Sequence, residues 1–569
     1  MTISNIESQR VDDIPLLLAI MAELGIQQEI DREIKPHGLW QGCSVGTIVV
    51  VWLCYILTEQ DHRLEPVQSW VNSRALLFNR LLGIELRETD FTDDRLANVL
   101  TMLGVTDTQE IITQRLSQDW ITMYKLPTQV SRYDSTTIAV YQDADEGEES
   151  IIGYGKSKDH RPDLAQFKVM LSSLDMGLPL TSQVVNGKRA DDGLYLPAYE
   201  QVVKTVGHSR FLAIGDSKMA AWETRCQMAR GGSWYLCPYR EPASRGEDSQ
   251  QWIEEALAQP EQWQAVTQTD EKTGEVKTVA HVYSWSRPQQ SHDPNGQLVT
   301  WDERVLVTHS LALQQGLITR RERGEAKLYQ ALDKLRLPPC RGRKRYRTEF
   351  ELRQVVDQTL KQLGMTGLVT VSLTAEAHKD GGQRWIVADY QRHQAAWEAM
   401  VARLGWHIYL TNVPEQEYTV QQIIHTYRRQ PLLERSISRL KSRNLHIRPV
   451  FLHDQQRICA LTWLLVLALR ILVLTEFRIR RELKLRQQAI LGLKPSSPTV
   501  AIDRPTTERI LQAFDGITWS IVSLEETQHF HLTPLSQTQL HILDLLDLSA
   551  DIYLNLNFDY SKPLFNLRE

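Results

Sequence analysis

The sequence predicts an α/β protein in which a mixed sheet core is interrupted by a β-rich insertion and preceded by a helical domain. Apolar helical patterns dominate the first ~125 residues, and short β-branched segments alternate with helices from about residue 133. A stretch rich in turn signals then separates two parts of that α/β pattern. The predicted domains are a helical N-terminal domain, a first core part, an insertion, a second core part and a C-terminal region: 1–125, 126–240, 241–404, 405–492 and 493–569.

The composition is that of an ordinary soluble protein. The 569 residues carry 64 Lys and Arg against 70 Asp and Glu, a net charge of −6, and 42% are hydrophobic, which argues against disorder, collagen and coiled coil. The six cysteines are dispersed without a C-x-x-C pair, which argues against a zinc ribbon or a disulfide scaffold and suits a reducing cytosol. The first residues do not read as a secretion signal, so we expect a cytoplasmic, nucleoid-associated protein.

Helices are expected first. Ile14–Gly25 and Val45–Leu57 are apolar runs with few strand breakers. Thr92 supplies a capping oxygen ahead of a periodic segment that ends at Gly104, which is a typical helix stop.

The core follows with strands. Three strands, a helix, a strand, a helix and a further strand are expected, which makes a meander leading into α/β units. The first four of these strands are Ser135–Val140, Phe167–Leu174, Leu180–Val185 and Phe211–Gly215.

The insertion is predicted from hairpin turns. Thr273-Gly274 and Asn295-Gly296 lie between alternating, strand-like runs. Two helical segments come next, and the α/β pattern resumes with a strand that ends at Asn412.

One segment has the composition of a membrane span. Ile458–Leu474 is almost entirely apolar over 17 residues, but it contains Arg470 and runs into a basic stretch. A charge inside a bilayer is costly, so we interpret the segment as a helix buried in a large soluble domain.

Two aspartates are placed where α/β sheets present functional groups. Asp134 is predicted at the opening of one strand and Asp216 at the carboxyl end of another. A single aspartate at such a place is more often a helix N-cap than a ligand, so neither establishes a site alone.

A basic segment supplies the third carboxylate. Residues 428–448 hold seven Lys or Arg and one acid, Glu434, a balance typical of a polyanion-binding surface. Tyr427, Glu434 and Lys441 are seven residues apart, which is two helical turns, although Pro431 favours a helix start that leaves Tyr427 just outside. Two aspartates and a glutamate form an oxygen-only set suited to Mg²⁺ or Mn²⁺. Alternatively, Glu434 is an ordinary surface ion-pair partner.

These residues carry a resemblance. Asp134 followed by STT, the stretch GYGKSKDHRPDLAQFKVML, FLAIG before Asp216, and Tyr427-x2-Gln430-x3-Glu434-x6-Lys441 resemble the DDE transposases of bacterial insertion sequences. More narrowly, they resemble the group with a Y-x2-R-x3-E-x6-K motif and a ribonuclease-H-like core split by a β-rich insertion. PTTERILQAFDGI near the C-terminus and the N-terminal helical region are also similar to this family, so the resemblance covers essentially the whole chain.

The resemblance implies a function. It implies metal-dependent hydrolysis and strand transfer at the ends of an insertion sequence through a hairpin intermediate, with two Mg²⁺ ions, replaceable by Mn²⁺, held by Asp134, Asp216 and Glu434. Double-stranded DNA with terminal inverted repeats, target DNA and a second copy of the chain are the implied partners. The N-terminal domain is expected to bind DNA and the C-terminal region to mediate dimerisation. No membrane partner is expected.

The motif departs from the family at one position. Gln430 stands where the family has arginine, so a charged, bidentate phosphate contact is lost. Arg428 or Arg429 is expected to substitute, and a Gln430→Arg change to strengthen the binding of DNA ends or to speed hairpin formation.

Further DNA contacts are expected outside the motif. The predicted DNA-binding residues are Tyr427, Arg428, Arg429, Gln430, Arg435, Lys441, Lys158, Arg161, Arg343, Lys344 and Arg345. The sequence does not choose among Trp263, Trp285 and Trp301 as a residue that stacks on an unpaired base.

Two alternatives remain open. One is a ribonuclease-H-like nuclease that cuts branched DNA without joining ends. The other is a transposase-derived DNA-binding protein without catalytic activity.

Overall fold

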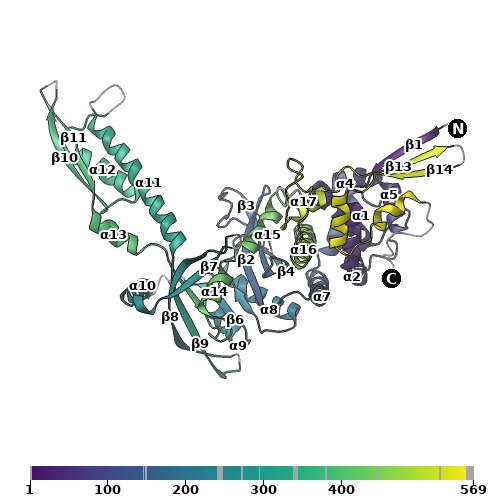
Figure 1. Cartoon of the computed structure of the whole chain (residues 1–569), viewed down its shortest axis with the longest axis horizontal. Coiled ribbons are helices and arrows are strands. Elements are labelled where there is room, and N and C mark those ends of the chain that lie inside the picture. Colours follow the sequence, from purple (N-terminus) through teal and green to yellow (C-terminus); the bar gives the residue numbers. More distant parts are fainter. Residues whose placement is uncertain are drawn as a thin grey trace. The chain divides into compact units, whose positions relative to one another are not determined.

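The computed structural model describes residues 3–144, 147, 150–239, 248–270, 273–293, 295–337, 344–378, 381–442, 445–524 and 527–558. The chain forms two compact units, the first of residues 1–235 and 426–569 and the second of Leu236–His425. Figure 1 labels the elements and colours them along the sequence. The predicted α/β class is confirmed, because a large mixed sheet is combined with many helices.

The predicted N-terminal helices are present. Thr92 Oγ1 accepts the backbone N–H of Arg95 at 3.2 Å, which caps the helix that ends before Gly104. The helices of this region are α1 (Ile14–Glu23), α2 (Ile26–Glu33), α3 (Val45–Glu59), α4 (Glu65–Asn72), α5 (Ala75–Leu82), α6 (Asp93–Leu103) and α7 (Thr106–Tyr124).

The first described residues correct the expectation of a purely helical start. Strand β1 (Ile3–Arg10) pairs antiparallel with β13 (Thr518–Leu524), which also pairs with β14 (Thr527–Leu532). Helices α17 (Thr507–Gln512), α18 (Gln537–Leu545) and α19 (Asp551–Leu554) belong to the same unit. Because the partner of β1 lies at the other end of the chain, no local pattern could reveal this strand.

The sheet of the first unit has the strand order β4-β3-β2-β5. Strand β2 is antiparallel to β3 and parallel to β5, and helices α8 (Tyr195–Val206) and α9 (Trp222–Arg230) follow β4 and β5 in the chain. The strands are β2 (Val130–Val140), β3 (Ala165–Leu174), β4 (Pro179–Asn186) and β5 (Leu212–Ile214). Asp134 therefore lies in the middle of β2 and not at its opening, because the buried residues before it also belong to the strand.

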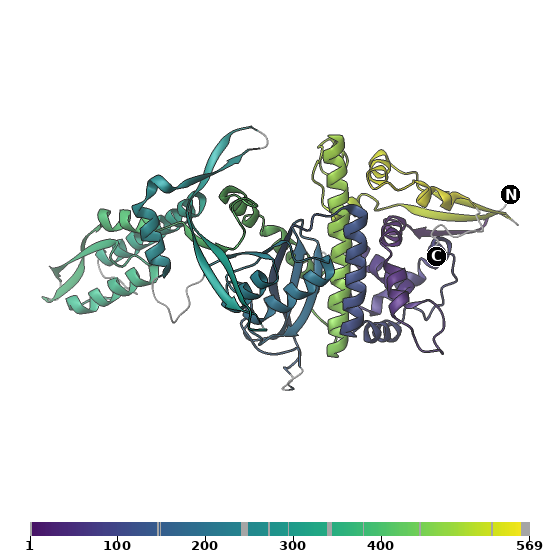
Figure 2. The same cartoon turned by 90° about the horizontal axis from the view of Figure 1, so that it is seen from below.

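Helix α16 (Gln455–Arg486) is the core helix predicted around Ile458–Leu474. It is long and apolar enough to cross a membrane, but 94% of its most apolar 18-residue stretch is buried within the structure. It packs beside α7 (Figure 2), where Trp463 Nε1 donates to Thr113 Oγ1 at 2.9 Å. Arg470 donates to Ser117 Oγ at 2.7 Å and lies 4.2 Å from the Trp120 ring centroid, and burial lowers the pKa of Arg470 to about 9.

The second unit is built on long hairpins. Strands β6 (Trp234–Pro238), which leads into the unit, β12 (Trp406–Thr411), β9 (Leu298–Ser310), β8 (Val276–His292) and β7 (Gln264–Thr269) lie in that order. Gly274 and Gly296, with φ of +71° and +81°, form the two predicted turns. Between β9 and β12 come α11 (Leu311–Arg336), α12 (Glu349–Leu363), β10 (Val369–Ala377), β11 (Gln383–Arg392) and α13 (Gln394–Ala402), which share a separate apolar cluster.

Truncation of a core side chain of α16 should destabilise the first unit. Leu464 is fully buried, so Leu464→Ala should lower the free energy of unfolding in urea by about 2–5 kcal/mol. Leu485 of the same helix is 70% exposed, and Leu485→Ala should change it by less than about 0.5 kcal/mol. Equal effects of the two substitutions would contradict a core role for the apolar half of α16.

A buried carboxyl group should make stability depend on pH. Burial raises the pKa of Asp13 to about 7, although Thr58 Oγ1 donates to Asp13 Oδ1 at 2.7 Å. The unfolded chain ionises near pH 3.8 while the folded chain keeps the proton, so stability falls from about pH 4 to about pH 7, by about 1.4 kcal/mol per pH unit. The difference in unfolding free energy between the wild type and Asp13→Asn should show this slope. A flat difference would contradict it.

Candidate active site

Asp134 and Asp216 are brought together by the register of two parallel strands. The paired residues of β2 and β5 are Val130 with Leu212, Ser131 with Ala213 and Arg132 with Ile214. Asp134 and Asp216 each follow the last of these pairs by two residues, and they lie near enough that the charge of Asp216 raises the pKa of Asp134. Strand β5 ends at Ile214, so both side chains lie where the carboxyl end of β5 leaves the edge of β2 uncovered.

The environment of Asp134 combines burial with a neighbouring negative charge. Burial raises the pKa of Asp134, Lys158 opposes this shift, and the charge of Asp216 adds to it. The carboxylate Oδ1 accepts the backbone N–H of Ser135 at 2.8 Å and the Lys158 ammonium at 3.2 Å. A cation beside this aspartate therefore stabilises its ionised form.

Asp216 is held by donors from a neighbouring helix and from its own turn. Tyr195 at the start of α8 donates its hydroxyl to Asp216 Oδ1 at 2.7 Å, and the backbone N–H of Lys218 donates to the same oxygen at 2.8 Å. Burial and then the charge of Asp216 raise the pKa of Tyr195, which keeps that hydroxyl a donor. Helix α9 begins only at Trp222 and its N-cap is Ala221, so Asp216 is not the cap of this helix.

Helix α15 (Pro431–Lys441) lies along β2, as Figure 1 shows. At its start, Arg132 Nη1 on β2 donates to Gln430 Oε1 at 3.2 Å. At its end, the Lys441 ammonium donates to Thr136 Oγ1 at 3.0 Å. The helix and the strand therefore run in the same direction, with Asp134 between the two contacts.

Glu434 lies on the same part of α15. It is seven residues before Lys441 and so on the same helix face, along the stretch of β2 that contains Asp134. Its side chain is exposed, and among the described residues it has no hydrogen-bond or ion-pair partner. This leaves the Glu434 carboxylate available for an external ligand.

The carboxylates fit a divalent cation as a facing pair and not as a closed cluster. Within the described ranges, no group of three or more His, Cys, Asp or Glu side chains is close enough to hold a metal ion. The Asp134–Asp216 pair nevertheless offers only oxygen ligands and carries mutual repulsion, which a hard cation such as Mg²⁺ relieves. Glu434 on the adjacent helix is the nearest predicted addition to this pair.

Tyr427, Glu434 and Lys441 do not stack along one helix. Tyr427 ends α14 (Val420–Tyr427), and α15 begins at Pro431, as predicted from the preference of proline for the first helical position. The face shared by all three residues is therefore corrected to a face shared by Glu434 and Lys441 alone.

The predicted DNA-binding residues of the first unit differ in their accessibility. Arg435 is exposed, Arg428 is half-buried, and Arg161 forms an exposed ion pair with Asp163 at 2.7 Å. Arg429 forms an ion pair with Asp175 at 2.6 Å while remaining 57% exposed. Arg435 and Arg161 are therefore accessible to a phosphate at the surface.

Lys441 is largely buried instead. Its ammonium contacts Asp159 Oδ1 at 2.6 Å, and Arg448 contacts the other oxygen of Asp159 at 2.9 Å. Burial lowers the pKa of Lys441, and the Asp159 carboxylate opposes that shift. A phosphate contact by Lys441 remains a prediction, and it would compete with Asp159.

The predicted basic patch of the second unit is only partly described. Lys344 lies 5.5 Å from the Tyr346 ring centroid, and Arg345 Nη2 donates to Gln383 O at 2.9 Å. Arg343 lies outside the described residues. Of the candidate stacking residues, Trp263 contacts Trp406 and Trp285 contacts Trp252 edge-on, so both are engaged within their own unit.

Arg132 is the structural residue that the sequence reasoning missed. It is fully buried on β2, and its Nη2 donates to Asp175 Oδ1 and to Thr426 O, both at 2.6 Å. Through these bonds and its contact with Gln430, Arg132 holds the residues between α14 and α15 against the sheet. The available signal was an arginine two residues before Asp134, in a strand whose other residues, apart from that aspartate, are uncharged.

Comparisons with known proteins add little to this geometry. A family model described as a domain of unknown function (DUF4277) matches residues 6–116, and no curated protein matches the sequence. A cryo-EM structure of the piggyBac transposase synaptic complex with hairpin DNA is similar with 8% identity and a TM-score of 0.33, over 90% of this chain and 82% of that one. A likeness this distant carries no argument about function.

Arginine at position 430 should destabilise the first unit. Gln430→Arg would remove the acceptor of Arg132 and place a second guanidinium beside it, whereas Gln430→Met only removes the acceptor. We expect Gln430→Met to lower the free energy of unfolding by about 1–3 kcal/mol and Gln430→Arg to lower it further. Urea unfolding measures both, and a Gln430→Arg protein as stable as the wild type would contradict this role of Arg132.

Proposed function

We propose that this chain is a DNA transposase that hydrolyses phosphodiester bonds at the ends of an insertion sequence and transfers the freed strands through a hairpin intermediate. The observation that carries the proposal is the pair Asp134 and Asp216, adjacent at the end of β5, with Glu434 on the helix that lies along β2. The motif order in the sequence supports the same reading.

Asp134, Asp216 and Glu434 would hold Mg²⁺ or Mn²⁺. Bound there, the ions would activate a water molecule or a 3′-OH and stabilise the leaving oxygen of an in-line displacement. The chain's own residues prepare the ligands: Tyr195 orients Asp216, and the backbone N–H of Ser135 supports the ionised form of Asp134.

The DNA backbone would lie along the exposed face of α15. Arg435 on this helix and Arg429 just before it are exposed and carry positive charge toward solvent on either side of Glu434. Phosphate contacts of this kind give binding that is salt-dependent and largely independent of sequence. Recognition of the terminal repeats and pairing of two protein copies are further parts of the proposal.

Removal of one carboxylate should abolish cleavage and leave DNA binding. Asp134→Asn, Asp216→Asn and Glu434→Gln should each reduce Mg²⁺-dependent nicking of a DNA end that carries the inverted repeat by about 10³-fold or more. Each variant should bind the same DNA within about threefold of the wild type in a gel-shift assay. Undiminished nicking by Asp216→Asn would contradict the site.

The same assays separate the alternatives. A nuclease would cut the end but fail to join a pre-cleaved end to target DNA. A DNA-binding protein without activity would bind and never cut, a reading favoured by the contact of Lys158 with Asp134 and by the open arrangement of Glu434.

A further inference from the structure

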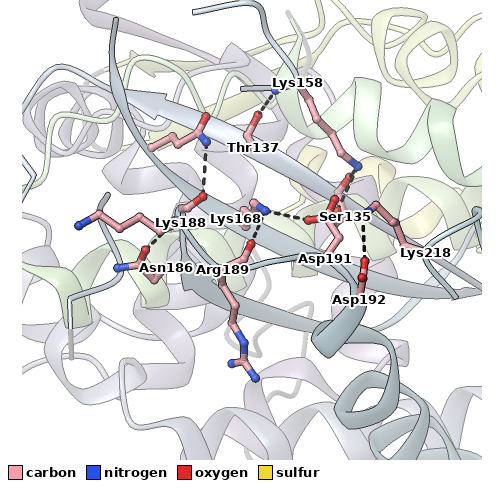
Figure 3. Close-up of polar contacts among 12 residues, drawn as sticks. Ser135, Thr137, Lys158, Lys168, Asn186, Lys188, Arg189, Asp191, Asp192 and Lys218 are labelled. Carbon is pink, nitrogen blue, oxygen red and sulfur yellow. Dashed lines mark hydrogen bonds and ion pairs between the residues drawn. The ribbon is translucent and has the colours of Figure 1, made fainter. Parts of the chain in front are cut away.

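The Lys158 ammonium occupies an oxygen-lined position beside the catalytic pair. It contacts Asp134 Oδ1 at 3.2 Å, Ser135 Oγ at 3.0 Å and the Ser135 carbonyl oxygen. Figure 3 shows this side chain reaching down to Ser135. A lysine has three N–H donors, so these three oxygens satisfy it completely. Oxygen atoms grouped in this way are also what a hard divalent cation takes as ligands.

The side chain can leave while its backbone stays in place. The backbone N–H of Lys158 donates to Thr137 Oγ1 at 3.0 Å, and the next residue, Asp159, is fastened to Lys441 and Arg448. The Lys158 side chain itself is 37% exposed and extends from an irregular loop. Rotation of its flexible stem toward solvent therefore needs no rearrangement of the sheet.

The neighbouring lysines form ion pairs with other carboxylates. Lys168 contacts Asp191 Oδ1 at 2.8 Å, and Lys218 contacts Asp192 Oδ1 at 3.0 Å (Figure 3). Among the described residues, Lys158 is the one whose ammonium contacts Asp134, so it supplies positive charge beside the two aspartates.

We propose that Lys158 is an internal counterion that competes with a divalent cation for Asp134, so that metal binding releases its ammonium to bind a DNA phosphate. The inference rests on the proposed function, because it assumes that Asp134 is a metal ligand. It adds a coupling: the cation that completes the site also frees a positive charge at the place where the scissile strand would lie.

Removal of the competing charge should tighten metal binding. In calorimetric titrations with Mn²⁺ and without DNA, Lys158→Met should lower the dissociation constant about three- to tenfold relative to the wild type. Lys188→Met is the matched control, since it removes an exposed lysine that contacts neither Asp134 nor Asp216, and it should change the constant less than about twofold. Weaker Mn²⁺ binding by Lys158→Met, or equal effects of the two substitutions, would overturn the proposal.

Asp134→Asn distinguishes failure of the inference from failure of the proposed function. If this variant binds Mn²⁺ as tightly as the wild type, the metal site is misassigned and the proposed function fails with it. If Asp134→Asn loses Mn²⁺ binding while Lys158→Met behaves like the control, only the counterion role fails.

A labelling experiment tests the release in the wild-type protein and needs no variant. An amine-reactive ester should modify Lys158 faster when Mg²⁺ is present, because the ammonium then leaves its three oxygen partners. Modification of the exposed Lys188, measured on its own peptide by mass spectrometry, should stay unchanged and serves as the internal reference. An unchanged or slower rate at Lys158 would contradict displacement.

Discussion

The buried guanidinium of Arg132 is the interaction on which the arrangement of the candidate site depends. Its contacts with Asp175, Thr426 O and Gln430 join three chain segments at one point of β2. Burial lowers the pKa of Arg132 and Asp175 opposes the shift, so the buried charge is stabilised by acceptors that match its donors. Because these contacts hold the start of α15 against β2, they also determine how near Glu434 comes to the two aspartates.

Charge in this region is balanced internally. Asp134 is matched by Lys158, Asp159 by Lys441 and Arg448, and Asp175 by Arg132 and Arg429. The net charge of −6 conceals this local order, because it averages a basic helix with a generally acidic chain. A polyanion would therefore meet a surface whose cations are already oriented by carboxylates.

Helix starts that depend on neighbouring residues could be predicted from the sequence, and contacts between residues distant in the chain could not. Pro431 fixed the start of α15 and Thr92 the start of α6, because both act within one helical turn. Strand ends suggested Asp216, but the placement of Asp134 in mid-strand and the Lys441–Asp159 contact depend on partners distant in the chain. Glu434 was predicted as the one acid of a basic segment and from its spacing to Lys441. Its position relative to the aspartates depends on Arg132, and no sequence motif indicates the partners of Arg132.

The pairing of β1 with β13 has a consequence for biosynthesis. Ile6 lies opposite Val522, so this small sheet cannot form until the residues up to β13 have left the ribosome. At about 5–20 residues per second, the first strand waits roughly 25 to 100 seconds for its partner. The apolar helices α1 and α3 wait with it for α16, which packs against both. Chaperones are therefore expected to bind the nascent chain. The first unit folds fully only after both of its segments have been translated.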